Sequence, residues 1–173
     1  MNNLILTMAP SPPLAELTID SPCGPLWLAA SGMGLTDLRP VAAKKALTVT
    51  AESAQMLQAH QFLQQAAEQL QQYFAGKRRD FSVPLAPAGT QFQQRVWSQL
   101  LQIPYGEACS YGELAQRIQQ PKAARAVGSA NGANHIAIII PCHRVIGKNG
   151  ALTGYAWGLT MKQQLLVLEA AEA

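Results

Sequence analysis

Five consecutive aliphatic residues, Ile136 to Ile140, lead directly into Pro141-Cys142-His143-Arg144-Val145, and no other segment restricts the possible fold so strongly. The run is far below the roughly 18 apolar residues that a membrane span needs, and it is typical of a strand buried on both faces. Such a strand requires a substantial core. A composition of 49% hydrophobic and 13% charged residues supplies one and excludes a disordered chain. We therefore predict a buried strand that presents Cys142 at its end, near the base of a cleft.

The length and the cysteines limit the architecture and the compartment. At 173 residues the chain has room for one domain or for two small ones that share a core. Its three cysteines, Cys23, Cys109 and Cys142, form no Cys-x-x-Cys pair and leave an odd thiol under any pairing. The N-terminus has neither the basic region nor the long apolar stretch of a secretion signal. These observations predict a protein of a reducing, cytoplasmic compartment with no membrane segment.

The net charge of +3 is unevenly distributed along the chain. Residues 1–83 carry six basic and six acidic side chains, whereas residues 84–173 carry seven basic and four acidic ones. No acidic residue occurs between Glu113 and Glu169, which indicates a surface that meets a polyanion. Chance clustering in a weakly basic protein is the alternative that charge alone leaves open. The basic residues of this window are Arg117, Lys122, Arg125, Arg144, Lys148 and Lys162.

The first half of the chain predicts a small antiparallel sheet followed by one long helix. Weak alternation over 14–19, 26–30 and 35–38, with Gly and Pro between these segments, is typical of strands joined by turns. From 52 to 74 the apolar residues recur at helical spacing, and glutamines form most of the polar side. Gly76 then ends the helix as a C′ residue.

The second half predicts a series of short helices. The segment 83–89, with two prolines, is expected to be extended and to link two subdomains. Thr90 is the N-cap of the first helix. Ser110 and Glu113 fit a capping box that opens a second helix, which ends near Pro121, where another begins almost at once. Two short helices joined by a tight turn form a helix-turn-helix pattern, which also occurs in proteins that bind no DNA.

The helix that follows Pro121 has an apolar face and an opposite face of small residues with two cations. Small residues allow close approach to a nucleic-acid backbone or groove, where Arg125 is the one long side chain. Tight packing of this face against another helix is an equally open alternative. At helical spacing the residues predicted to face the core are Ala123, Ala126, Val127 and Ala130, and those on the opposite face are Lys122, Arg125, Gly128 and Ser129.

Cys142 is a candidate nucleophile. A free thiol with a pKa of ~8.5 is only a few per cent ionised at neutral pH, so a neighbouring group must favour the thiolate. His143 is the expected helper, with Arg144 adding positive potential. Adjacent residues do not face each other, so a water is expected to bridge Cys142 and His143. Glu169 or Glu172 would orient the imidazole. The alternative is a small buried hydrophobe, the usual state of a free cysteine.

Ordered motifs extend well beyond the cysteine segment. They are Tyr73-Phe74-Ala75-Gly76, Gly89-Thr90 with Phe92-Gln93 and Val96-Trp97, Ile103-Pro104 with Gly106, Ser110-Tyr111 with Leu114-Ala115, Ala124-Arg125-Ala126-Val127-Gly128, Asn134, Pro141 to Val145, and Gly154-Tyr155. In order and spacing this set resembles the O6-alkylguanine-DNA alkyltransferases, the methylated-DNA–protein-cysteine methyltransferases. The resemblance covers about residues 70–169, with a weaker match over the hairpin from Leu14.

The resemblance implies an α+β (α/β) fold with two domains. Residues 1–83 would form an N-terminal domain of the ribonuclease H-like kind, with a small antiparallel sheet and a helix. Residues 84–173 would form a helical, winged-helix-like domain that binds DNA through the helix-turn-helix and carries the active-site cysteine.

The resemblance also implies a role for each matching residue. Cys142 matches the acceptor of the alkyl group, His143 the water-linked base and Glu169 the carboxylate that orients it. Tyr111 matches a tyrosine that rotates the phosphate and gives a proton to the departing guanine, and Arg125 matches the arginine that replaces the flipped base in the minor groove. The other implied DNA contacts are Lys122, Gly128 and Ser129, and the implied pocket and structural residues are Asn134, Val145, Tyr155, Ala156 and Trp157.

The activity implied is direct-reversal DNA repair, in which a methyl or larger alkyl group moves from O6-alkylguanine in duplex DNA to Cys142, with O4-alkylthymine as a further candidate substrate. A thioether has no easy route back to a thiol, so each molecule, expected to be a monomer, would act once and need no cofactor or metal. The alternatives are a non-catalytic lesion-binding protein, whose relatives lack the cysteine, and a Cys-His hydrolase. Two departures from the family pattern, His135 and Trp157, bear on loop mobility and on acceptance of bulky alkyl groups.

Overall fold

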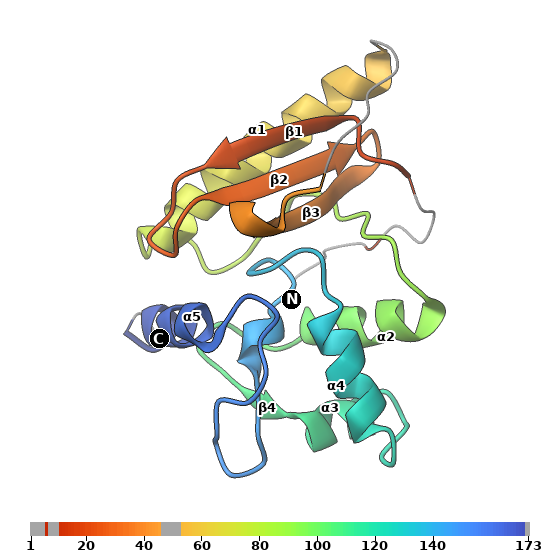
Figure 1. Ribbon diagram of the computed structural model, residues 1–173, viewed down its shortest axis with the longest axis vertical. Coiled ribbons are helices and arrows are strands. Elements are labelled where there is room, and N and C mark those ends of the chain that lie inside the picture. The colour runs from red at the N-terminus through yellow and green to blue at the C-terminus, as the bar shows by residue number, and fades with distance from the viewer. Residues whose placement is uncertain (1–5, 7–10, 46–52, 172–173) are drawn as a thin grey trace. The chain divides into compact units, whose positions relative to one another are not determined.

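The computed structural model describes residue 6 and residues 11–45 and 53–171. The chain divides between Ala88 and Gly89 into two compact units (Figure 1). The first contains the sheet and one long helix, and the second contains the remaining helices. The predicted fold class, a sheet-plus-helix half followed by a helical half, is confirmed.

The first unit is built on a three-stranded antiparallel sheet in the order β1-β2-β3. Leu17, Leu28 and Leu38 lie opposite one another across the three strands. The backbone N of Leu35 donates to Pro84 O at 2.8 Å, so the segment after the long helix returns to this sheet. The strands match the predicted ones, and the bounds are β1 (Ala15–Ile19), β2 (Leu26–Ser31) and β3 (Gly34–Pro40), with a 3-10 turn, η1 (Val41–Ala43), after β3.

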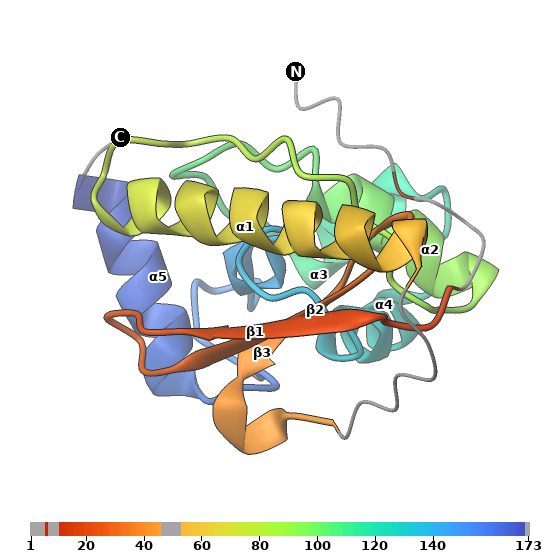
Figure 2. The ribbon, with the colours of Figure 1, turned by 90° about the horizontal axis from the view of Figure 1, so that it is seen from above.

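One long helix, α1 (Ala54–Phe74), lies along one face of this sheet (Figure 2). The side chain of Ser53 caps its first turn, and the start predicted at residue 52 lies outside the described residues. Gly76 has φ +69°, the left-handed conformation expected of a residue that ends a helix. The predicted apolar face is confirmed, since the buried residues include Leu63, Ala66 and Leu70.

The second unit is mainly helical. Its helices are α2 (Gln91–Leu100), α3 (Tyr111–Arg117), α4 (Ala124–Gly132) and α5 (Leu159–Ala171), and its two-residue strands β4 (Cys109–Ser110) and β5 (Val145–Ile146) pair in parallel. Thr90 with Gln93 and Ser110 with Glu113 form complete capping boxes at α2 and α3. Helices α3 and α4 pack together as a helix-turn-helix. The β4–β5 pairing, which the sequence did not predict, ties the start of α3 to the residues that follow Cys142.

The aliphatic run Ile136–Ile140 is a buried turn, and the prediction of a strand there is wrong. Its backbone folds back so that Ile140 N donates to Ile136 O at 3.1 Å, and Ile138 has φ +69°, outside the strand region. The amide of Asn134 replaces a strand partner by donating to Ile136 O at 3.2 Å and to Ile140 O at 2.9 Å. A short apolar run predicts burial but does not distinguish a strand from a turn held by a buried side chain.

The set of buried residues on helix α4 differs in part from the predicted set. Val127 and Ala130 are buried as expected, but Ala126 is exposed. Asn131 lies on the core side instead, because it is at i+4 from Val127. Ala123, just before the helix, is half-buried. The opposite face keeps its predicted character, with Lys122, Arg125 and Ser129 exposed and Gly128 half-buried.

Candidate active site

Cys142 is the first residue of a short 3-10 helix, η2 (Cys142–Arg144), which joins the buried turn to β5. The residue is only 3% exposed. Its sulfur accepts a hydrogen bond from Asn134 Nδ2 at 3.1 Å, and its backbone N donates to Ile140 O at 2.8 Å. The amide that shapes the buried turn therefore also fixes the position of the sulfur.

The ionisation of Cys142 is controlled by groups that the sequence only partly identified. Burial raises the pKa of the thiol, and the hydrogen bond from Asn134, the positive charge of Lys162 and a hydrogen bond to Tyr155 oppose that rise. Lys162, rather than the expected Arg144, supplies the positive charge, because the guanidinium of Arg144 is engaged elsewhere. The thiol needs a base to become nucleophilic.

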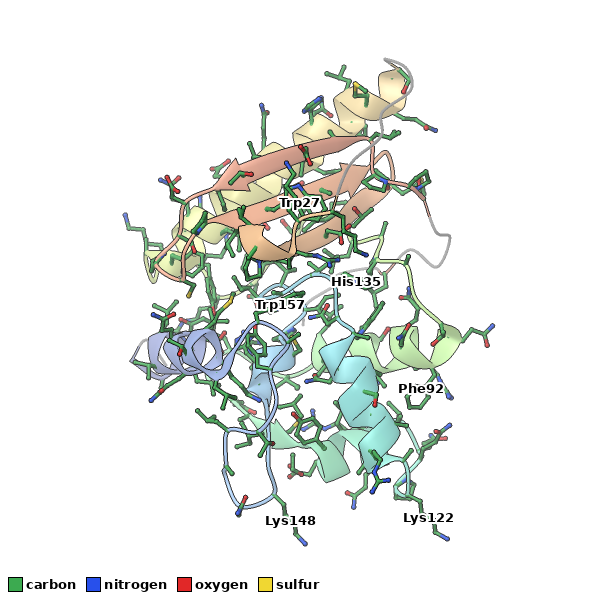
Figure 3. All side chains as sticks on the ribbon, viewed as in Figure 1. Trp27, Phe92, Lys122, His135, Lys148 and Trp157 are labelled. Carbon is green, nitrogen blue, oxygen red and sulfur yellow. The ribbon has the colours of Figure 1, made fainter. Side chains whose placement is uncertain are left out.

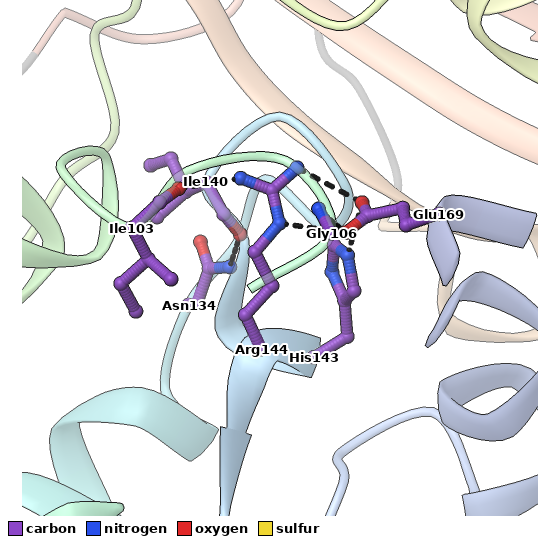
Figure 4. Close-up of polar contacts among 7 residues, drawn as sticks. All are labelled: Ile103, Gly106, Asn134, Ile140, His143, Arg144 and Glu169. Atoms are coloured by element: carbon purple, nitrogen blue, oxygen red, sulfur yellow. Dashed lines mark hydrogen bonds and ion pairs between the residues drawn. The ribbon is translucent and has the colours of Figure 1, made fainter. Parts of the chain in front are cut away.

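His143, Arg144 and Glu169 form a buried polar cluster (Figure 4). Glu169 Oε1 lies 2.8 Å from His143 Nε2, and both carboxylate oxygens accept from Arg144, at 2.8 and 2.9 Å. Arg144 Nη1 also donates to Ile103 O at 2.6 Å, and Gly106 N lies 3.3 Å from the same carboxylate. The cluster therefore links η2, α5 and the loop after α2.

Glu169 is ionised within this cluster. Burial favours the neutral acid, but the hydrogen bonds from His143 and Arg144 outweigh burial and hold the pKa of the carboxyl far below its ordinary value. Of the two acids that the sequence left open, Glu169 makes this contact, and Glu172 lies outside the described residues.

His143 is completely buried, and burial lowers its pKa despite the opposing hydrogen bond with Glu169. Within the described residues its Nδ1 has no hydrogen-bond partner, and no direct hydrogen bond joins it to Cys142. With Nε2–H donating to Glu169, Nδ1 carries the free lone pair. His143 is thus a neutral imidazole able to accept a proton at Nδ1.

Lys162 is a site residue that sequence reasoning missed. It lies on α5 and is completely buried, and its Nζ donates to the carbonyls of Val145 at 2.6 Å, Thr153 at 3.2 Å and Gly154 at 3.3 Å. The signal was its spacing, because Lys162 is at i−7 from Glu169 on the buried face of a helix. One ammonium group therefore holds the carbonyl after η2 and the loop before α5 together.

A cavity of about 140 Å³ opens between the helix-turn-helix and the loop before α5. Its walls include Tyr111, Gly128, Tyr155 and Ala156, four residues singled out from the sequence. Asn134, Val145 and Trp157 are not among the lining residues, and neither is Cys142, whose contacts reach the cavity through Tyr155 and Asn131. The complete lining is Tyr111, Gly128, Asn131, Gly132, Gly154, Tyr155 and Ala156.

Tyr111 connects the two helices of the helix-turn-helix to the loop before α5. Its hydroxyl donates to Thr153 O at 3.0 Å. Burial raises the pKa of this phenol, so Tyr111 stays protonated as a potential donor. A Cβ on Gly128 would lie 3.7 Å from the Tyr111 ring, an ordinary van der Waals distance, so the ring packs beside α4 at this position.

The remaining sequence candidates lie at the surface or near the cavity. Lys122 and Lys148 point outward from the second unit (Figure 3). Arg125 is exposed on α4. Trp157 is half-buried in the loop before α5, and the ring of His135 packs edge-on against Trp97, with centroids 5.8 Å apart. In the described part of the chain no group of three or more His, Cys, Asp or Glu side chains could hold a metal ion, and no helix is long and apolar enough to cross a membrane.

Fold and site together define a protein in which a buried cysteine, held by a hydrogen bond from Asn134, lies next to a helix-turn-helix. Residues 14–87 match the family model of the 6-O-methylguanine DNA methyltransferase ribonuclease-like domain, and residues 91–171 match that of its DNA binding domain. The chain belongs to the 6-O-methylguanine DNA methyltransferase family, as the resemblance predicted.

Individual relatives are similar along nearly their whole length. The methylated-DNA–protein-cysteine methyltransferase of Methanosarcina acetivorans is 51% identical over 87% of this chain and 94% of its own, and that of Mycobacterium tuberculosis is 52% identical over 90% and 92%. The crystal structure of Mycobacterium tuberculosis OGT in complex with DNA has a TM-score of 0.80 at 51% identity, covering 91% of this chain and 94% of that one. The enzyme of Pyrococcus kodakaraensis, at 17% identity and a TM-score of 0.51, shares the fold.

Proposed function

We propose that this chain is a DNA-repair methyltransferase that moves an alkyl group from O6-alkylguanine in DNA to its own Cys142. The observation that carries the proposal is the anchored sulfur of Cys142, which Asn134 holds at 3.1 Å beside residues that wall a cavity. Sulfur is a strong nucleophile toward an alkyl carbon once it is deprotonated. Relatives at about half identity carry the name methylated-DNA–protein-cysteine methyltransferase, which supports the same reaction.

The proton of Cys142 passes to His143 through a water. His143 is neutral, its Nδ1 is available, and ionised Glu169 at 2.8 Å stabilises the imidazolium that forms. The thiolate attacks the alkyl carbon, so the S–C bond forms as the C–O6 bond breaks. The electron pair of that bond goes to the guanine, and the protonated hydroxyl of Tyr111 supplies the proton that neutralises it. The proton held by His143 then passes through solvent to the Tyr111 oxygen, so both side chains return to their neutral forms. The product is a thioether, and each molecule acts once without a cofactor.

Duplex DNA binds along α4, from the minor-groove side. The alkyl group on O6 lies within the base stack, so the nucleotide has to be flipped out before reaction. Arg125 takes the place of the flipped base, while Lys122, Ser129 and the backbone at Gly128 contact the DNA strand. This assignment is supported by the exposed, small-residue face of α4 and by the absence of acids between Glu113 and Glu169. A monomer is sufficient for this geometry.

The residues around the site have different roles. Tyr155 and Ala156 enclose the flipped base, the carbonyl of Val145 reads its edge, and Trp157 limits the size of the alkyl group. Asn134 is a positioning residue, since it binds the sulfur and the buried turn and no base. Residues 84–173 carry the reaction, and residues 1–83 form the companion domain, in a protein of the cytoplasm.

A stoichiometry measurement tests the proposed function. A fixed amount of duplex with one O6-methylguanine per molecule is incubated with increasing amounts of protein, and the remaining lesion is counted by digestion and chromatography. We expect one lesion to be removed per protein molecule and no further turnover. Binding without loss of the lesion would favour a non-catalytic lesion-binding protein, and removal of many lesions per molecule would exclude an alkyl acceptor.

A further inference from the structure

Strand β1 lies at an open edge of the sheet in the first unit (Figure 2). The order β1-β2-β3 gives β1 one partner strand, whereas the opposite edge of the sheet, at β3, is extended by a bridge between Leu35 and Leu85. Within the described residues no strand pairs with the outer edge of β1. Such an edge presents unpaired backbone N–H and C=O groups, to which another chain can add. Pro13 and Pro22 flank the strand and limit an added segment to about the five residues of β1 itself.

A cavity of about 450 Å³ lies beside the end of β1. One wall comes from the last residue of β1 and the turn that follows it, and the other wall comes from the last turns of α1. The volume is within the range of about 300–1,000 Å³ that is typical of ligand pockets. Part of the wall is apolar, with Ile19 and Phe74 half-buried. The complete lining is Ile19, Asp20, Pro22, Ala67, Glu68, Gln71 and Phe74.

Hydrogen bonds and ring packing hold the walls of this cavity in place. In the turn after β1, Ser21 Oγ donates to Gly24 O at 2.6 Å and accepts from Cys23 N at 3.2 Å. On α1, the ring of Phe74 packs edge-on against the buried ring of Tyr73, with centroids 5.3 Å apart. The cavity is therefore formed before a ligand binds, which lowers the cost of binding.

The charged side chains of the cavity are both acidic. Asp20 and Glu68 are exposed carboxylates, and no basic side chain is among the lining residues. In the part of the chain that the structure describes, neither carboxylate forms an ion pair, although Glu68 Oε1 accepts from Gln72 Nε2 at 3.3 Å. The cavity thus fits an apolar stem that ends in a cation, which is the form of a lysine or arginine side chain.

We propose that β1 and this cavity form a docking site for an extended, basic segment of another protein. The segment adds as a strand beside β1 and places a lysine or arginine stem against Phe74, with its cation between Asp20 and Glu68. Backbone hydrogen bonds supply affinity in this mode of recognition, and the cavity supplies the preference for a side chain. The inference goes beyond the proposed function, because every residue that carries it belongs to the first unit and none to the candidate active site.

Charge favours a different protein over a second copy of this chain as the occupant. Two copies that paired through β1 would offer each other the segment Ala15–Ile19, which contains no basic residue and one glutamate. That segment would bring a carboxylate, rather than a cation, toward Asp20 and Glu68. Like charges in close contact are unfavourable, so the acidic cavity selects against pairing of this kind.

Three peptides test the site on the full-length protein. The probe is fluorescein-labelled Val-Lys-Val-Arg-Val-Lys, whose binding is followed by fluorescence anisotropy. One matched peptide carries backbone N-methyl groups, which block strand pairing but keep every charge, and the other has glutamate in place of each cation. We expect both to bind at least about tenfold more weakly than the probe. Equal binding of the N-methylated peptide would overturn the proposal, as would absence of probe binding below about 1 mM.

The variant Glu68→Lys reverses one charge of the cavity at an exposed position of α1. We expect it to weaken binding of the probe by about tenfold and to strengthen binding of the glutamate peptide. Asp80→Lys, at an exposed acid of the same unit outside the lining, is the matched control and should stay within about twofold of the unaltered protein. Equal binding by both variants would overturn the placement of the cation.

Two further measurements separate this inference from its alternatives. Sedimentation velocity without peptide should show no dimer, and a dimer that the probe dissociates would assign the edge to a second copy and overturn the proposal. Lesion removal by Glu68→Lys should keep the stoichiometry of the unaltered protein. A loss of peptide binding is therefore distinguishable from a failure of the proposed function.

Discussion

His143 Nε2 lies 2.8 Å from Glu169 Oε1, and the two side chains are 0% and 1% exposed. The same carboxylate is held by two hydrogen bonds from Arg144, so it remains ionised next to a neutral imidazole. When the imidazole of His143 gains a proton, it forms a buried ion pair with Glu169, and neither side chain has to move because the two are already in contact. The geometry thus favours proton transfer from the cysteine at little cost in reorganisation.

Replacing Glu169 by Gln should damage both stability and reaction. The substitution leaves Arg144 buried without its counter-ion, which is expected to cost about 3 kcal/mol or more in the free energy of unfolding. It also removes the charge that stabilises protonated His143, so transfer should slow. Urea denaturation and single-turnover rates measure the two effects. Glu107→Gln, at an exposed glutamate of the same unit, is the control, and a stability loss equal to that control would contradict the buried cluster.

Acid should destabilise the protein in two steps. The folded-state pKa values of His143 and Glu169 lie below the ordinary values of these groups, about 6.5 and 4.5, so the unfolded chain binds more protons as the pH falls. The contribution of these two groups to the free energy of unfolding is fully present at pH values above their ordinary, unfolded-state pKa values. It is lost as the pH drops, first through the range of histidine and then through that of the carboxylate. Urea midpoints between about pH 8 and about pH 5 should therefore decrease, and the decrease should be smaller in His143→Gln. An unchanged midpoint, or the same decrease in the variant, would argue against a neutral buried His143.

Removing the charge of Lys162 should make Cys142 harder to ionise. Lys162→Met deletes the cation that lowers the pKa of the thiol, so that pKa should rise further. The substitution also frees the carbonyls of Val145, Thr153 and Gly154, so transfer should slow in addition. Iodoacetamide labelling against pH reports the thiol titration directly. Lys148→Met, at an exposed lysine, is the matched control, and an identical titration in both variants would exclude the proposed role.

Arg125→Ala should affect duplex substrates far more than free bases. If Arg125 fills the space of a flipped base, its loss should slow transfer from duplex DNA by about tenfold or more, because flipping costs a few kcal/mol. Transfer from O6-methylguanine supplied as the free base needs no flipping and should change by about twofold at most. Arg95→Ala, at an exposed arginine on α2, is the control. Equal losses on both substrates would place Arg125 in a structural role.

Local sequence signals predicted the elements whose determinants are local. The capping boxes at Thr90 and Ser110, the apolar stripe of α1 and the left-handed Gly76 all depend on residues within a turn or two of one another. The three-stranded sheet was predicted for the same reason, because Gly and Pro residues mark its turns.

The features that sequence reasoning missed depend on partners distant in the chain. The run Ile136–Ile140 forms a turn because the buried side-chain amide of Asn134 donates hydrogen bonds to its backbone carbonyls. The apolar composition of the run does not predict these hydrogen bonds. Lys162 was counted among the basic residues of a surface that meets a polyanion, but it is buried because three carbonyls from other segments surround its ammonium group. Arg144 was expected to act on the thiol and instead binds a carboxylate on α5. On α4, Asn131 is buried, whereas Ala126, which was predicted to face the core, is exposed.

The central claim is that Cys142 itself receives the alkyl group. Intact-mass spectrometry before and after incubation with O6-methylguanine duplex, followed by peptide mapping, measures this directly. The account predicts a gain of one CH2 group per chain, located on the peptide that contains Cys142. No gain should occur in Cys142→Ala, and Cys23→Ala should gain the group normally. An unchanged mass, or the same gain in Cys142→Ala, would contradict the account.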